Sequence, residues 1–333
     1  MSNNRNLMIL AVIVVALGVI YAMSSQRRPS LDTSGGFADL VEGTLSTDEV
    51  QSISVRRGGE GFTMVNGDGG WVIEDHFGAP ANLNKIRTLL GNLESVTGEL
   101  RSDDDGVLAS YALDDSQAYH LKIDEAVDLM VGKRSGSGCF VREGGSSKVY
   151  ATDHNFLSDF GVWGDDRPAP QVTSWIDLVA FEVAREEITR VRIDGDETVT
   201  LDKELAIAEP EEPAEGEGEV PAGSPGENYE WRVNGDFVGS RTRGDAVISS
   251  LVSIRGGDVL GRGENPEGSG LDDPDRITVT LEGATELTLL FGDAVADMSG
   301  QVWFRVEGRE LLWAVPEFVK GNLFKTADEL RAE

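Results

Sequence analysis

The sequence predicts an α+β fold: an N-terminal transmembrane helix followed by two tandem hairpin–helix–meander modules whose sheets are mostly antiparallel. Three observations lead to this fold class. Residues 7–23 carry no charge, apolar and polar residues alternate in many short segments, and a set of landmarks recurs in the same order roughly 140–160 residues later. The chain has 333 residues, which suits two domains of ordinary size.

The charge of the chain limits its partners. There are 59 acidic residues against 29 basic ones, and the net charge is −30. Such a surface repels the phosphates of nucleic acids and of anionic lipids, so we expect no nucleic-acid partner. Hydrophobic residues make up 40% of the chain and are enough to build cores, while the one cysteine, Cys139, cannot form an internal disulfide.

The N-terminal segment predicts a membrane anchor. Residues 7–23 would span about 25 Å as a helix, which is at the short end of what crosses a bilayer. Residues 1–6 would form a cytoplasmic tail and residues 24–46 a juxtamembrane linker. The bulk of the chain would then be periplasmic, at the inner (cytoplasmic) membrane of a bacterium. A cleaved signal peptide is the alternative, although Ala22 and Ser24 make a poor cleavage site.

Seven landmarks indicate an internal duplication. The matching pairs are 50–55 with 188–193, Trp71 with Trp231, Leu113 with Leu271, Gly132 with Gly292, Arg142 with Arg305, Tyr150 with Trp313, and Phe160 with Phe324. We therefore expect one α+β repeat at 47–163 and a second at 187–326. Residues 164–186 would connect them, and residues 327–333 would be a C-terminal tail.

The sequence pattern predicts the same order of elements in each copy. A β-hairpin comes first, and its second strand carries a tryptophan. An amphipathic helix follows, near 83–96 in the first copy and 243–259 in the second, because apolar residues recur there at helical spacing. A polar loop with a Leu-Asp-Asp turn leads into a meander of short strands, and a short aromatic helix ends each copy, at 154–160 and 316–324.

One segment interrupts this pattern. Residues 206–228 contain seven glutamates, no basic residue and many Pro and Gly residues, and they fall in the first hairpin of the second copy. Such a composition cannot bury enough apolar surface to order itself, so we expect a disordered acidic loop. An acidic segment that docks on a partner is the alternative.

Each sequence pattern that could indicate catalysis or metal binding is explained better by a structural role. Asp194 and Asp196 match the Asp-x-Asp-x-Thr pattern of a phosphatase that uses an aspartyl nucleophile, but the strand before them alternates, as in a hairpin with one buried face. Residues 103–106 lack the last glutamate of a calcium loop, and the three histidines are far apart. We therefore expect a protein that is not an enzyme, with no catalytic residue, cofactor or metal.

The connection between the copies is the candidate interaction surface. Trp163 and Trp175 flank a proline-containing segment that includes Arg167. An aromatic pair at such a joint predicts a cleft that binds a partner or a polymer. Packing that only fixes the angle between the modules is the alternative for these residues.

The order of the landmarks resembles a known family. The residues are an N-terminal anchor, Trp71, the helix start 80–82, the run 111–114, the pair 131–132, and the run 140–142 that leads into Tyr150. This order is similar to that of the family catalogued as domain of unknown function 4340, and it covers both copies. The chain departs from it in the acidic insertion and in Ser269-Gly270, where the first copy has Tyr111-Ala112.

The resemblance implies a role. Members of that family are membrane-anchored, and many are encoded beside subunits of ABC transporters of the gliding-motility type. By resemblance we expect a non-catalytic, extracytoplasmic auxiliary or binding subunit of such a transporter, with its permease and ATPase subunits as partners. The alternative is a free-standing scaffold or polymer-binding protein of the cell envelope. The family supplies no catalytic residues.

Overall fold

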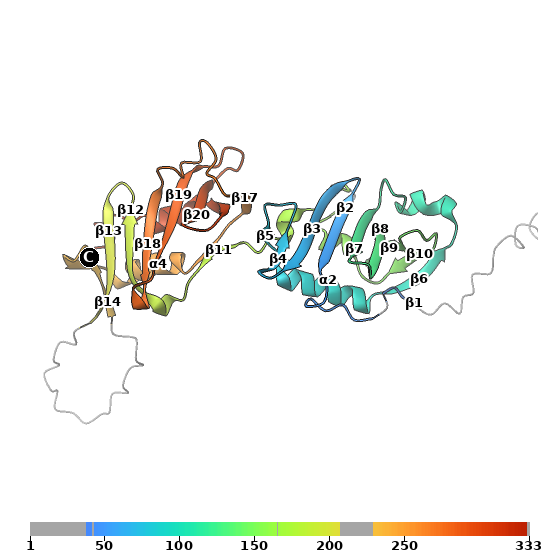
Figure 1. The fold of residues 1–333 in the computed structure, drawn as a ribbon, viewed down its shortest axis with the longest axis horizontal. Helices are drawn as coiled ribbons and strands as arrows, with labels where there is room; N and C mark the ends of the chain where they lie inside the picture. The colour runs from blue at the N-terminus through green and yellow to red at the C-terminus, as the bar shows by residue number, and fades with distance from the viewer. Residues whose placement is uncertain (1–37, 42, 165, 207–228, 332–333) are drawn as a thin grey trace, which may run out of the picture.

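The computed structural model describes residues 38–41, 43–164, 166–206 and 229–331. They form two bodies that lie side by side, module 1 from residue 38 to 176 and module 2 from residue 177 to 331 (Figure 1). The anchor expected at 7–23 and nearly all of the acidic insertion at 206–228 lie outside the described residues.

Module 1 is built mainly from short strands around one long helix. Its elements are β1 Ala38–Asp39, β2 Ser52–Arg57, β3 Glu60–Gly67, β4 Gly70–Ile73, β5 Ala79–Pro80, α2 Leu83–Ser95, β6 Thr97–Ser102, the 3-10 helix η1 Asp105–Tyr111, β7 Tyr119–Ile123, β8 Val127–Ser135, β9 Gly138–Glu143, β10 Val149–Thr152, α3 Phe156–Asp159 and the 3-10 helix η2 Val172–Trp175.

The elements of module 2 follow the same general order, but two short strands follow its long helix where module 1 has β6, and its 3-10 helices lie at other places. The elements of module 2 are β11 Val179–Glu182, the 3-10 helix η3 Arg185–Glu187, β12 Ile188–Asp194, β13 Thr198–Leu205, β14 Tyr229–Val233, β15 Phe237–Val238, α4 Arg241–Leu251, β16 Ser253–Arg255, β17 Asp258–Arg262, β18 Asp275–Leu281, the 3-10 helix η4 Glu282–Ala284, β19 Glu286–Ala294, β20 Gln301–Val306, β21 Leu311–Pro316 and α5 Glu317–Leu323.

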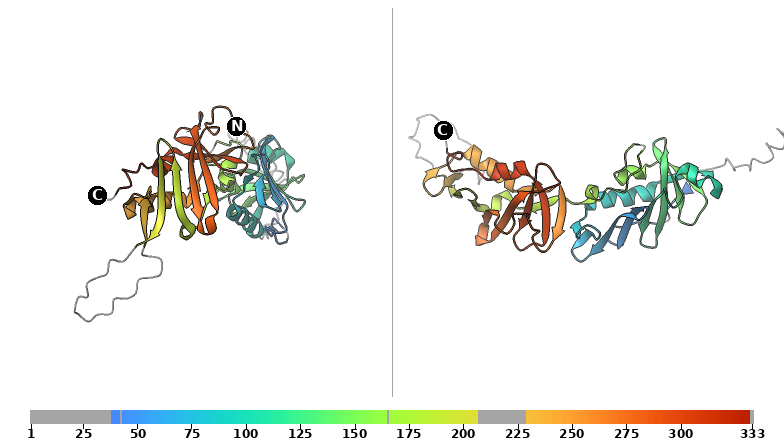
Figure 2. Two further views of the ribbon diagram at one scale, coloured as in Figure 1. Left: turned by 60° about the vertical axis from the view of Figure 1, so that its left-hand side comes forward. Right: turned by 90° about the horizontal axis from the view of Figure 1, so that it is seen from above.

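The two large sheets have one strand order. Nine strands of module 1 run β6-β10-β9-β8-β7-β2-β3-β4-β5, and those of module 2 run β17-β21-β20-β19-β18-β12-β13-β14-β15. Neighbouring strands are antiparallel in both. A short strand also pairs with the segment after each long helix, β1 with β6 and β11 with β16. Figure 2 shows the helices of each module on one face of its sheet.

The expected fold class needs correction. The described residues are mostly antiparallel sheet with few helices, and every helix among them is too short or too polar to span a bilayer. The expected α+β class is therefore wrong, and none of the described helices is the expected transmembrane helix. The helix expected near 243–259 is also too long, because α4 ends at Leu251 and strands β16 and β17 follow. A pair of glycines, Gly256 and Gly257, separates these strands.

The long helix of each module packs on the inner face of its sheet. Helix α2 begins after Asn82, whose side chain accepts a hydrogen bond from the amide of Lys85, as an N-cap does. Its buried face carries Ile86, Leu89, Leu90 and Leu93. These residues join the alternate buried residues of the strands in one continuous core.

A loop clamped by an arginine covers the outer face of the sheet in module 1. Arg142 on β9 is only 6% exposed, and its Nε donates to Leu113 O at 2.8 Å. It also pairs with Asp115 at 2.7 Å. The clamped loop buries Leu113 against Met130 and Val149 in a second, smaller core. Burying a guanidinium is tolerated here because protein oxygens accept its hydrogen bonds.

Module 2 repeats this clamp with a different linkage. Arg305 on β20 donates to Gly263 O at 2.8 Å and to Asn265 Oδ1 at 3.0 Å. Asn265 in turn donates to Leu271 O at 3.1 Å. Leu271, Leu290 and Leu312 form the corresponding small core. Each loop therefore depends on one arginine of the third meander strand.

Each clamp also needs a glycine where the loop crosses the sheet. A Cβ atom at Gly132 would lie 2.4 Å from Tyr111 O, and one at Gly292 would lie 2.1 Å from Ser269 O. Both obstructing atoms are backbone atoms. Any side chain at these positions would therefore push the loop away from the sheet.

We predict that Gly132→Ala destabilises the protein by about 1–3 kcal/mol, because the added methyl group overlaps the loop backbone. The free energy of unfolding from urea denaturation measures the change. Gly91→Ala is the matched control, since a Cβ at this helical position meets no atom within 4 Å. That control should be neutral or stabilise the protein by up to about 1 kcal/mol. Equal stabilities of the Gly132 variant and the natural protein would contradict the clamp.

A carboxylate joins the helix of module 2 to its sheet. Asp245 on α4 accepts hydrogen bonds from Trp231 Nε1 at 3.0 Å and from Tyr229 OH at 2.8 Å, and it pairs with Arg185 at 2.9 Å. Burial alone would raise the pKa of Asp245, but these hydrogen bonds and the charges of Arg185 and Arg241 outweigh it. The pKa of Asp245 therefore lies below its usual range.

We predict that Asp245→Asn lowers the stability of the protein by about 1 kcal/mol at neutral pH. A lowered folded-state pKa gives stability that is fully present above the unfolded pKa and is lost as the pH falls through the folded pKa. The stability difference between the natural protein and the variant should therefore shrink as the solution is acidified. Urea denaturation across the carboxyl titration range measures it, and a difference that grows on acidification would refute the assignment.

Candidate interaction surface

The three residues expected to form the interaction surface lie in different environments. Trp175 is 1% exposed, and its ring centre lies 6.1 Å from that of Phe62 in the core of module 1. Trp163, by contrast, is 71% exposed just after α3. The two tryptophans therefore do not form one exposed aromatic surface, and only Trp163 is presented to a partner.

Arg167 is a partly buried structural residue. Its guanidinium carbon lies 5.1 Å from the centre of the Tyr119 ring, and its Nη atoms lie within 3.5 Å of Ala112 O and Val131 O. Burial lowers the pKa of Arg167. The residue thus holds the connection against the loop and the sheet of module 1.

The end of each module returns to the start of its long helix. We call this segment the strap, residues 172–176 in module 1 and 326–331 in module 2. The amide of Asn82 donates to Trp175 O at 2.7 Å, and the amide of Ser240 donates to Leu330 O at 2.8 Å. Residues 327–331, expected to be part of a tail, therefore pack on module 2.

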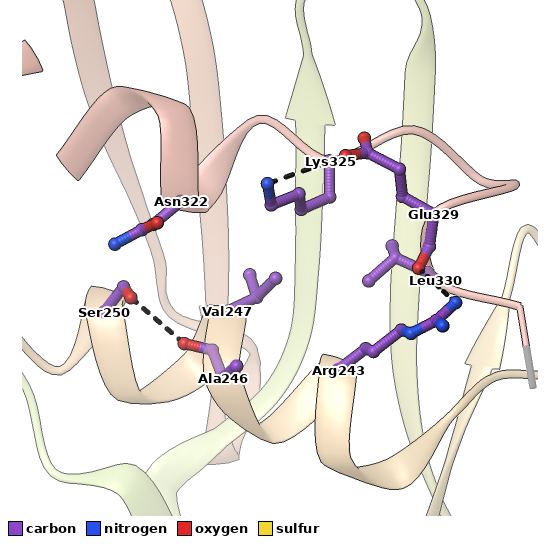
Figure 3. Close-up of a pocket in the computed structure, with 8 residues that line it drawn as sticks. All are labelled: Arg243, Ala246, Val247, Ser250, Asn322, Lys325, Glu329 and Leu330. Carbon is purple, nitrogen blue, oxygen red and sulfur yellow. Dashed lines mark hydrogen bonds and ion pairs between the residues drawn. The ribbon is translucent and has the colours of Figure 1, made fainter. Parts of the chain in front are cut away.

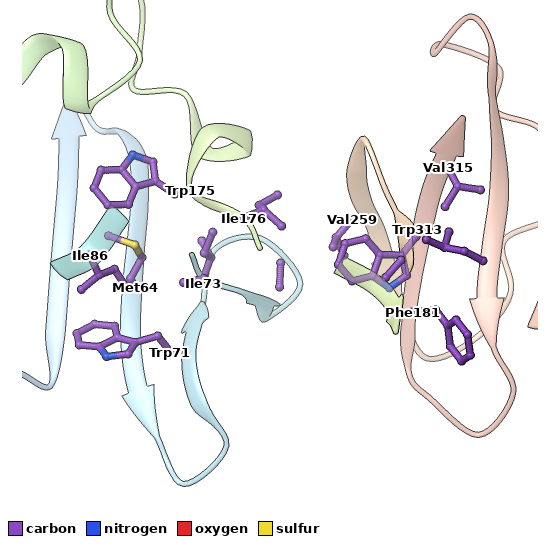
Figure 4. Packing of buried hydrophobic residues seen from close by; sticks show 14 of the residues in the cluster. Met64, Trp71, Ile73, Ile86, Trp175, Ile176, Phe181, Val259, Trp313 and Val315 are labelled. Atoms are coloured by element: carbon purple, nitrogen blue, oxygen red, sulfur yellow. The ribbon is translucent and has the colours of Figure 1, made fainter. Parts of the chain in front are cut away.

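The junction between the modules follows directly from the first strap. The amide of Asp177 donates to Pro80 O at 2.7 Å, which fixes the first residue of module 2 against β5. His76 Nε2 lies 2.8 Å from Asp258 Oδ1, and Arg262 Nε donates to Phe77 O at 2.8 Å. Figure 4 shows the buried residues of the two modules on either side of this junction.

We predict that the double variant His76→Ala/Arg262→Ala loosens the junction without unfolding either module, because it removes the side-chain bonds between them. Spin labels on cysteines at the exposed positions Asp68 and Glu286 report the distance between the modules. Its distribution should become broader. The natural Cys139 is fully buried, and burial raises the pKa of its thiol to about 11, so it will not be labelled.

Arg192→Ala is the control for this measurement. It removes an exposed arginine that pairs with Asp194 inside module 2, so the distance distribution should not change. An unchanged distribution in the double variant would show that the two side chains do not hold the junction.

A groove of about 590 Å³ lies on the outer face of module 1. Its lining includes Arg56, His120, Asp128 and Arg142. These charges are already paired: Arg56 with Asp75, His120 with Asp128, and Arg142 with Asp115. The charged side chains of this groove therefore already have partners within the chain.

A second kind of groove lies on the helical side of each module. In module 2 it has a volume of about 500 Å³ between α4, α5 and the strap (Figure 3). Val247 and Leu330 form its apolar floor. Arg243 donates to Glu329 O and Arg331 O, and Lys325 lies 3.6 Å from the Glu329 carboxylate. The basic groups of this groove are therefore engaged by the strap itself.

Module 1 has the corresponding groove, with a volume of about 370 Å³. It is lined by residues from α2, α3 and the strap, namely Asn82, Asn84, Lys85, Thr88, Leu89, Ser158, Asp159 and Trp175. Lys85 occupies the third position of its helix, as Arg243 does in α4. Sequence reasoning did not single out this groove, since its walls come from three segments that are separate in the sequence, 82–89, 158–159 and 175.

The phosphatase pattern forms a hairpin turn. Strand β12, which ends at Asp194, is antiparallel to both of its neighbours. The carboxylate of Asp194 accepts hydrogen bonds from Arg192 and Thr198, and the Arg192 bond holds the pKa of Asp194 below its usual range. Asp194 is thus a turn residue in a salt bridge. Within the described ranges, no three His, Cys, Asp or Glu side chains are placed to hold a metal ion.

Comparison with known proteins identifies the family. The profile of the family described as Domain of unknown function (DUF4340) matches residues 71–274, from β4 of module 1 to the loop before β18 of module 2. Searches of curated proteins and of solved structures gave no match. The matched range contains the first strap and the junction. Because it spans more than half of the sequence, the chain belongs to the DUF4340 family.

Proposed function

We propose that this chain is a non-catalytic, extracytoplasmic binding subunit of an ABC-type transporter complex at a bacterial inner membrane. The observation that carries the proposal is membership of the DUF4340 family. The link to ABC transporters of the gliding-motility type is what the family resemblance implies. The permease and ATPase subunits would be its partners, and the ATPase would supply the energy.

The architecture favours a role in binding. The protein consists of two modules that carry grooves and an exposed aromatic residue, and the charged groups of the outer groove of module 1 are committed to ion pairs. The modules would act together, because the strap and the junction hold them next to each other. A partner would therefore meet a preformed surface.

We also propose that the two modules are tandem copies of one unit. The shared order of nine strands supports this, since each strand of module 1 has a counterpart at the same place in module 2. The matching clamps at Arg142 and Arg305 support it as well. The copies differ at the exposed aromatic residues, so their surfaces are suited to different contacts.

Purification of the tagged, full-length protein from its native membrane in a mild detergent tests the proposal. Mass spectrometry should find an ABC ATPase and a multi-span permease in amounts comparable to the protein itself. Trp163→Ala should reduce their recovery about tenfold, because a large exposed aromatic residue is a common centre of binding energy. Phe318→Ala, which removes a 68% exposed aromatic side chain from module 2, is the matched control.

The proteins recovered in this experiment distinguish a transporter subunit from a free-standing protein of the cell envelope. Recovery of the protein alone, or with cell-wall material, would refute the transporter association and favour an envelope scaffold or polymer-binding protein. Recovery of both transporter subunits with the natural protein and with Trp163→Ala would leave the association standing and move the contact to another surface.

A further inference from the structure

We propose that the open edge of strand β6 is an interface at which two copies of this chain pair across a two-fold axis. Residues 99–101 of one copy lie antiparallel to residues 99–101 of the other, with Leu100 at the axis. Figure 1 shows β1 and β6 at the end of module 1 that points away from module 2. The interface is a property of module 1 and does not rest on the transporter association.

In the described part of the chain, three of the four edges of the two large sheets are covered by other segments. At the β5 edge the first strap adds a β-bridge between Ala81 and Ile176. At the β15 edge the second strap adds a bridge between Gly239 and Arg331. The β17 edge meets the loop 76–78 of module 1. An uncovered edge strand can pair with a strand of another chain, so proteins usually protect such edges.

The fourth edge is covered only in part. Strand β1 pairs with Thr97 and Gly98 of β6 and reaches no further along it. Beyond these two residues, β6 pairs with β10 on one side. Among the described residues, no strand lies on its other side. Leu100, in the middle of this stretch, is 39% exposed. The edge is therefore accessible to a strand from outside the chain.

The sequence of this edge is complementary to itself. In an antiparallel pair centred on Leu100, Glu99 of each copy lies opposite Arg101 of the other copy, and the two Leu100 side chains meet. Directly opposite residues share one face of the sheet, and opposite charges there stabilise the pair. Within one chain, Arg101 Nη2 already lies 2.9 Å from Glu99 Oε2, so these side chains lie on the same face of the strand.

Other registers lose this complementarity. A pair centred on Arg101 would place two arginines opposite each other, and like charges at directly opposite positions destabilise a strand pair. A pair centred on Glu99 would oppose two glutamates, and it would also need the edge of Gly98 that β1 already occupies. The charges and β1 together therefore select the register centred on Leu100.

The interface is small and closed. A two-fold interface uses the same patch of both copies, so the pairing ends at a dimer. Only a few residues of each strand take part, which is less than the interface of a permanent dimer. We therefore expect a dimer that forms and separates reversibly, and a covalent trap is the suitable way to detect it.

Disulfide trapping of Leu100→Cys in cells that produce the full-length protein tests the pairing. Opposite Cα atoms of antiparallel strands lie about 4.5–5.5 Å apart, which a disulfide can span. Val238→Cys is the matched control, because Val238 is 43% exposed on the edge strand β15. After mild oxidation, Leu100→Cys should give at least about tenfold more disulfide-linked dimer than the control. The buried Cys139 is common to both variants.

Charge reversal tests the register. Adding Arg101→Glu to Leu100→Cys should lower the yield of dimer about tenfold, because two pairs of glutamates then face each other. Adding Glu99→Arg as well should restore the yield, since the opposite charges are only exchanged. Circular dichroism of each variant checks that it is folded.

Three results would overturn the proposal. The first is a yield from Leu100→Cys no higher than that from Val238→Cys, which would mean that other residues of the chain cover this edge or that it stays open. The second is a failure of Glu99→Arg to restore the pairing lost in Arg101→Glu. The third is a cross-linked product that contains a different protein in place of the second copy.

Discussion

Two backbone hydrogen bonds set the arrangement of both modules, one from the amide of Asn82 to Trp175 O and one from the amide of Ser240 to Leu330 O. Each joins the end of a module to the residue before the first turn of its long helix. The first amides of a helix have no hydrogen-bond partner inside it. These two bonds therefore also satisfy donors that would otherwise lack a partner within the protein. The strap they fix forms one wall of each helical groove. In module 1 it also brings Asp177 against β5 and thereby places module 2.

The landmarks that indicate a repeat in the sequence are the residues that the fold cannot easily replace. Gly132 allows the loop to cross the sheet, and Arg142 holds that loop, which explains why Gly292 and Arg305 recur at the matching places. The hairpins, the helix α2 and the meander strands were predictable, since their buried residues follow a period of two or of 3.6. The repetition was readable because packing constrains each of these positions.

The features that sequence reasoning missed lack such a pattern. Strand β6 is mostly polar and only Gly98 in it is buried, so nothing marks it as the strand that pairs with β10. Apolar residues continue past the end of α4 into β16 and β17, which extended the expected helix too far. Trp163 and Trp175 look equivalent in the sequence, but tertiary packing buries the second and leaves the first exposed. The groove lined by Lys85 and Asp159 was not predictable either, because tertiary packing creates it.

The most direct test of this account is native-state hydrogen exchange of the Asn82 and Ser240 amides in the full-length protein without a ligand. If the straps fix the modules and preform the grooves, both amides should exchange as slowly as those in the central strands β2 and β12, which open only on unfolding of a whole module. Exchange several orders of magnitude faster at Asn82 than in β2 would contradict the account. It would show that the first strap opens locally, and that neither the groove nor the junction of module 1 is held in place.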